Sequence, residues 1–74
     1  MNNILFFQLL EKNHGLIKRI SEKTWMQEAN MSTTIKTGKK KGGFSTYFMI
    51  KVTDAINDFY GSNYTIQQLF FDKV

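Results

Sequence analysis

The sequence predicts a small all-α domain, a single bundle of four to five helices spanning residues 1–74. Apolar residues recur at helical spacing in several segments, and capping or helix-stopping residues stand at their boundaries. Apolar residues make up 42% and aromatic residues 15% of the chain, enough for one folded core. The residues leave one alternative open, an α+β domain. In it a basic β-hairpin over about residues 31–53 joins N-terminal helices to a C-terminal helix.

The first half of the chain predicts two amphipathic helices. Residues 2–13 place Ile4, Phe7 and Leu10 on one face, and Asn2 or Asn3 can cap the start. The sequence Asn13-His14-Gly15 predicts a stop, with Gly15 in the left-handed conformation. Residues 16–29 predict the second helix. Its apolar side is formed by Leu16, Ile17, Ile20, Thr24 and Trp25.

Residues 30–53 fit either helix or strand. Segments 32–37 and 44–52 are rich in β-branched and aromatic residues, which favours strands, and glycines flank the lysine run as in a hairpin tip. In contrast, Met49, Val52 and Ile56 share one helical face, and that helix would continue to about Gly61.

The C-terminal segment, residues 64–70, predicts a short helix. Thr65 is its expected cap, and Ile66, Leu69 and Phe70 are its expected buried side. The apolar tail Leu69-Phe70-Phe71, ending in Val74, either packs on the first helix or extends apolar surface to a second subunit.

The basic charge is concentrated in the middle third of the chain. No acidic residue occurs between Glu28 and Asp54, and residues 29–53 carry a local charge of +5. Residues 1–28 carry +1 and residues 54–74 carry −2. The positive electrostatic potential of such a segment attracts a polyanion, most commonly nucleic acid. We expect Gly38–Gly43 to form a basic turn that contacts phosphates; a solvated loop that keeps the protein soluble is the plainer alternative.

Three segments carry a resemblance to a known family: residues 20–24, the stretch 30–39 with its basic Gly-Lys exit, and residues 48–57 together with 65–70. Over about residues 5–70 the chain resembles the lambda-repressor/Cro-like helix-turn-helix family. Trp25 stands where that family usually has glycine in a left-handed turn, and an indole there would be strained. Ser21 replaces the family's small alanine, and the loops after Gly38 and Asn57 are longer than usual.

The resemblance implies that the second helix of the motif lies in the major groove of double-stranded DNA. Amides, hydroxyls and a carboxylate suited to base edges would come from Gln27, Glu28, Asn30, Ser32 and Thr33. Phosphate contacts would come from Lys36, Lys39, Lys40 and Lys41. In the hairpin alternative, Thr34, Lys36, Ser45 and Tyr47 would line the face of a basic ribbon.

The expected function is therefore that of a small sequence-specific DNA-binding protein, such as a transcriptional regulator of the phage or plasmid type. A homodimer would suit a palindromic site. One alternative is a phage-type protein-binding inhibitor whose basic loop occupies a partner's nucleic-acid or acidic groove. Another is a non-specific binder of single strands that stacks bases on its aromatic residues, although such residues more often form the core.

Nothing in the sequence points to catalysis. Cysteine is absent, His14 is the only histidine and the six carboxylates are scattered, so we expect no enzyme, metal site, cofactor or small-molecule substrate. The glycines around the lysine run lack the spacing of a nucleotide-binding loop. The apolar runs are too short to span a membrane, and without cysteine or a signal peptide a cytoplasmic location is expected.

Overall fold

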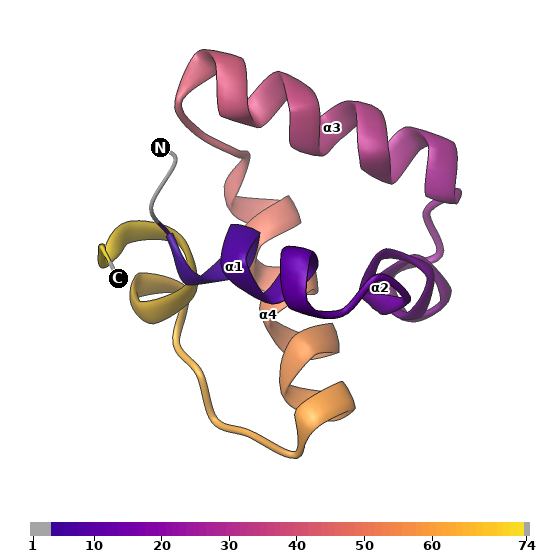
Figure 1. The fold of residues 1–74 in the computed structure, drawn as a ribbon, viewed down its shortest axis with the longest axis vertical. Coiled ribbons are helices and arrows are strands. Elements are labelled where there is room, and N and C mark those ends of the chain that lie inside the picture. Colours follow the sequence, from indigo (N-terminus) through magenta and orange to yellow (C-terminus); the bar gives the residue numbers. More distant parts are fainter. Residues whose placement is uncertain (1–3, 74) are drawn as a thin grey trace.

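The computed structural model describes residues 4–73, and in that range it contains five helices and no strand (Figure 1). The helices are α1 (Leu5–Lys12), α2 (Leu16–Thr24), α3 (Glu28–Lys41), α4 (Thr46–Tyr60) and the π-helical turn η1 (Gln67–Phe71). The all-α prediction is confirmed. An isolated β-bridge between Ile4 and Lys73 joins the two ends of the described chain.

The alternative with a β-hairpin over 31–53 is wrong. The first part of this segment belongs to α3, and a link over 42–45 leads into α4. Met31, Ile35 and Gly38 recur on one side of α3 and are buried there, which is a helical and not an alternating pattern. The threonines that favoured a strand are exposed or half-buried on the rest of the helix. Tertiary burial therefore overrides their β propensity.

Several predicted boundaries also change. The second helix ends at Thr24 and not at residue 29, because Trp25 takes the left-handed conformation with φ 61°. Gly15 has φ −84° and is the N-terminal cap of α2, so it does not adopt a left-handed conformation. The first helix begins at Leu5, and the predicted caps Asn2 and Asn3 lie outside the described residues. The predicted end of α4 is confirmed, with Gly61 as its left-handed cap.

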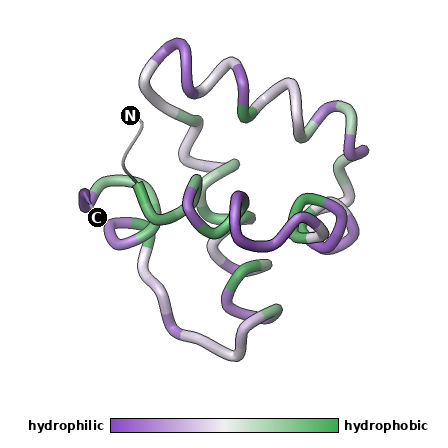
Figure 2. The backbone as a smooth tube through the Cα atoms, viewed as in Figure 1, coloured by the Kyte–Doolittle hydropathy of each residue, from purple (hydrophilic) through white to green (hydrophobic). Residues whose placement is uncertain are grey.

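The core is built around five phenylalanines. The rings of Phe6 and Phe70 have centroids 4.9 Å apart, and those of Phe44 and Phe48 stack at the same distance. Phe7 completes the cluster. Figure 2 shows hydrophobic residues along α1 and hydrophilic residues at the C-terminal end of α3. In the rest of the core, α2 packs on α3 and α4 through buried apolar residues: Leu16, Ile20, Met31, Val52 and Ile56.

The C-terminal segment folds back on α1. Thr65 Oγ1 accepts a hydrogen bond from the Gln68 amide at 3.1 Å, and Gln68 Oε1 accepts one from the Thr65 amide at 2.8 Å. This reciprocal pair confirms the predicted cap. Leu69 and Phe70 are buried as predicted, Ile66 is half-buried, and Phe71 is exposed. The apolar tail therefore packs on the first helix, and Phe71 is its exposed aromatic residue. Between residues 4 and 73, no helix has the length and apolar character needed to cross a membrane.

Candidate nucleic-acid interface

The solvent-facing side of α3 forms a polar and basic strip. We call this strip the α3 ridge and define it by its exposed residues: Ala29, Asn30, Thr33, Lys36, Thr37, Lys40 and Lys41. The opposite side of the helix is held in the core by Met31, Ile35 and Gly38. The ridge is therefore presented by a helix whose rotation about its own axis is fixed by packing.

The lysine run is helical and not a turn, which corrects the sequence prediction. Lys39, Lys40 and Lys41 form the last turn of α3, and Gly42 ends the helix with φ 79°. Successive helical residues are rotated by about 100°, so the three side chains point in different directions. The Lys39 ammonium lies 4.8 Å from the centroid of the Phe7 ring, toward α1, whereas Lys40 and Lys41 stay on the ridge.

The charge of the ridge is not neutralised within the fold. The one acidic residue of α3 is Glu28, in its first turn. Among the residues that the structure describes, the one ion pair joins Lys23 of α2 to Asp58 of α4. The ridge lysines therefore have no carboxylate partner in this part of the chain. Lys40 and Lys41 lie in the last turn of the helix, where the negative end of the helix dipole favours a cation.

The predicted base-reading residues divide between two places. Asn30 and Thr33 lie on the N-terminal half of the ridge, and Thr33 Oγ1 donates a hydrogen bond to the Ala29 carbonyl at 3.0 Å. Gln27 is exposed at the residue before α3. Ser32 is half-buried and lies apart from them. It lines a 380 Å³ groove between α1 and α3, together with Lys36 and Lys39.

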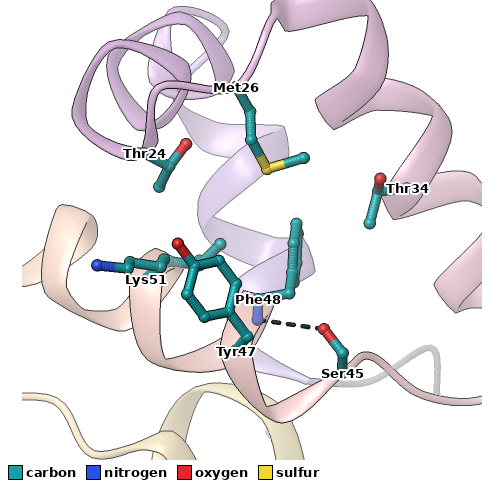
Figure 3. Close-up of a pocket in the computed structure, with 8 residues that line it drawn as sticks. Thr24, Met26, Thr34, Ser45, Tyr47, Phe48 and Lys51 are labelled. Carbon is teal, nitrogen blue, oxygen red and sulfur yellow. Dashed lines mark hydrogen bonds between the residues drawn. The ribbon is translucent and has the colours of Figure 1, made fainter.

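Ser45 and Tyr47 line a second groove, of 290 Å³, between the α2–α3 turn and α4 (Figure 3). Thr34 reaches it from α3 and Lys51 from α4. Ser45 Oγ accepts a hydrogen bond from the Phe48 amide at 3.2 Å and so caps α4. Tyr47 is 69% exposed, with the Lys51 ammonium 5.5 Å from its ring centroid. Thr34, Ser45 and Tyr47 thus line one groove. Lys36, which the hairpin alternative placed on the same face, lines the other groove.

Two features of this surface were not predicted from the sequence. Thr37 belongs to the ridge, and its spacing of four residues from Thr33 is the signal that a helical interpretation would have used. Trp25 was predicted to lie on the apolar side of the second helix, which is wrong: it follows that helix and is 93% exposed. Its φ of 61° is left-handed, a conformation that is unfavourable for a bulky side chain.

The described residues hold no cluster of three or more His, Cys, Asp or Glu side chains that could bind a metal ion. His14 is exposed in the α1–α2 turn and lines the 380 Å³ groove between α1 and α3, but not the groove beside Tyr47. The ridge itself presents hydrogen-bonding groups and positive charge to solvent. Comparison of the chain with protein-family models, with curated proteins and with solved structures gives no match.

Proposed function

We propose that this protein binds double-stranded DNA through the α3 ridge, as a small sequence-specific DNA-binding protein of the transcription-regulator type. One observation carries the proposal. A single exposed helix face joins amide and hydroxyl groups in its N-terminal half to lysines without carboxylate partners in its C-terminal half. Hydrogen-bonding groups suited to base edges and cations suited to phosphates are the two components that sequence-specific binding requires.

The dimensions and surroundings of α3 suit this role. Its 14 residues extend over about 21 Å, and an α-helix fits the major groove, which is about 12 Å wide. The helix follows α2 after a three-residue turn, Trp25–Gln27, and packs against α2. In helix-turn-helix proteins the N-terminal residues of the second helix contact the bases. Asn30 and Thr33 occupy that end here.

The roles then separate along the ridge. Asn30 is the strongest candidate for base readout, because an amide can donate and accept at an adenine edge. Thr33 is the second candidate. Lys36, Lys40 and Lys41 contact phosphates and set the register of the helix in the groove. Lys39 is turned toward Phe7, so it contributes to the positive electrostatic potential of the surface more than to direct phosphate contacts.

The test compares two double variants with the same loss of charge. K40Q/K41Q removes two ridge lysines, and K12Q/K73Q removes two exposed lysines outside α3. Affinity for a duplex is measured by fluorescence anisotropy over a range of salt concentrations. If both ridge lysines contact phosphates, K40Q/K41Q weakens binding and reduces the salt slope by about 1.8, at roughly 0.9 per contact. K12Q/K73Q should behave like the wild type. Absence of duplex binding at low salt would overturn the proposal.

A second candidate function, binding to a protein partner as an inhibitor, is supported by the exposed large hydrophobic residues. Trp25, Tyr47 and Phe71 are each more than half exposed. Exposed aromatic residues are enriched at protein interfaces. The same titration, run with single-stranded DNA in parallel, separates the alternatives. Preference for the single strand favours a stacking mode, and no binding to either form favours the protein partner.

A homodimer is part of the proposal when the target site is palindromic. Two copies of α3 would then occupy half-sites about one helical turn of DNA apart. Sedimentation of the protein with and without duplex measures the stoichiometry. Two protomers per duplex are expected for a palindromic site.

A further inference from the structure

Trp25 combines a strained backbone with a side chain that gains almost no stability from burial. Its φ of 61° places a bulky residue in the left-handed region, where glycine is favoured. Its side chain is 93% exposed, so a large apolar surface remains in water. A glycine at this turn would avoid the strain and would lose almost no buried surface.

The fold gains no visible contact from the indole. Trp25 is absent from the core cluster and from the half-buried hydrophobic residues that pack against it. Among the aromatic pairs and cation–π contacts found in residues 4–73, none includes Trp25. By comparison Met26, the next residue, is half-buried against the core. The side chain of Trp25 is therefore free to contact a ligand.

Trp25 lies near the N-terminal end of the α3 ridge. It lies at the C-cap of α2, three residues before the start of α3, at the end of the ridge that carries Asn30. Lys40 and Lys41 lie at the opposite end of α3, roughly 20 Å away along the helix. A duplex that binds along the ridge between these ends would bring one of its strands close to the α2–α3 turn.

We propose that Trp25 packs on the sugar–phosphate strand that borders the major groove when the α3 ridge is bound. This inference rests on the proposed function. The indole would lie against deoxyribose, and its Nε1–H would donate to a phosphate oxygen. Indole has one donor and no acceptor, so it matches a strand of apolar sugars and acceptor-only phosphates better than the mixed edge of a base pair. The contact therefore adds affinity without selecting a sequence.

The chain contains one tryptophan, so its fluorescence reports on Trp25 alone. On addition of duplex we expect a blue shift of the emission and a lower rate of acrylamide quenching, because the indole leaves water. Duplex binding itself is followed independently by the anisotropy of a labelled duplex.

Two substitutions keep the turn compatible with the left-handed conformation. W25G and W25N should both retain or raise the melting temperature, since glycine and asparagine adopt positive φ more readily than tryptophan. Both should weaken duplex binding by about tenfold, equivalent to ~1.4 kcal/mol. The loss should be equal for a selected and a random duplex. The salt slope should stay unchanged, because no charge is removed. Phe71→Ala, at an exposed aromatic residue of η1, is the control and should bind as the wild type does.

The outcomes separate this inference from the proposed function. If the duplex binds, yet the emission is unchanged and W25G binds as tightly as the wild type, the indole lies outside the interface. The inference is then wrong, and the proposed function stands. A fall in melting temperature in both W25G and W25N would also overturn it, because the indole would then support the fold. If no duplex binds at low salt, both proposals fail.

Discussion

The ring of Phe44 lies against the α-carbon of Gly38, so closely that a methyl group on Gly38 would overlap it. Gly38 is in the interior of α3, where glycine costs about 1 kcal/mol relative to alanine. In return, Phe44 stacks on Phe48 and meets Phe6 edge-on, with centroids 5.9 Å apart. This contact packs the C-terminal, lysine-bearing end of α3 against the link that leads into α4.

Replacing Gly38 by alanine should therefore destabilise the protein, although alanine is the better helix former. Overpacking of a core typically costs 1–3 kcal/mol, and we expect a loss of about 2 kcal/mol in the free energy of unfolding. Urea denaturation measures it. The matched control is Gly43→Ala, where nothing lies within 4 Å of the added carbon. That variant should be neutral or slightly stabilised. Equal stability of the two variants would contradict the role of Phe44.

Thr53 of α4 carries a buried hydroxyl group without a hydrogen-bond partner. An unpaired buried polar group costs about 1–3 kcal/mol, and valine has nearly the same shape as threonine. Thr53→Val should therefore raise the free energy of unfolding by about 1 kcal/mol. In Thr24 the hydroxyl donates to the Ile20 carbonyl at 2.8 Å, so Thr24→Val should give no such gain. Thermal and urea denaturation of both variants would show the difference, and a loss of stability in Thr53→Val would contradict it.

The Lys23–Asp58 ion pair makes stability depend on pH at the acid end. The 2.7 Å hydrogen bond from Lys23, followed by its charge, lowers the pKa of Asp58 below the ordinary 3.8. The folded pKa is thus below the unfolded one, so the contribution is fully present above the unfolded pKa. It is lost as the pH falls through the folded value. Both side chains are more than half exposed, so we expect a small effect.

NMR titration of the Asp58 carboxyl group tests this directly. Lys23→Gln should return the pKa of Asp58 toward its ordinary value. Asp58→Asn should lower the melting temperature near neutral pH and have little effect at a pH below the folded pKa. The same pKa in wild type and Lys23→Gln would show that the ion pair is not formed in solution.

Periodicity predicted the helices whose buried faces are strongly apolar, and it failed where two patterns coincide. Met49, Val52 and Ile56 identified α4, and Thr65 identified the cap before η1. In α3 the threonines fit a strand as well as a helix, and the decisive contact is between Gly38 and Phe44, which are six residues apart. A hairpin tip and a helix end both use glycine, so local sequence could not separate them.

For the candidate site, the sequence located the basic segment and missed its geometry. The sequence predicts Lys39, Lys40 and Lys41 as one phosphate-binding cluster, but helical rotation turns Lys39 toward Phe7. Trp25 fits the apolar spacing of α2, yet the helix ends one residue before it. For Lys39 the rotation along the helix decides on which surface the side chain lies, and for Trp25 one backbone dihedral angle decides it. Residue composition carries no information on either.

The division of the α3 ridge into two halves predicts different effects on affinity and on specificity. Asn30→Ala removes an amide expected to contact a base edge, so it should reduce binding to the selected duplex by about 1–3 kcal/mol and leave random duplex nearly unaffected. Lys40→Gln should weaken binding to both duplexes equally and lower the salt slope of binding by about 0.9. Selection of a preferred duplex from a random library, followed by anisotropy titrations of both variants, measures these quantities. An equal effect of Asn30→Ala on both duplexes would remove this residue from base readout, because a backbone contact weakens every sequence to the same degree.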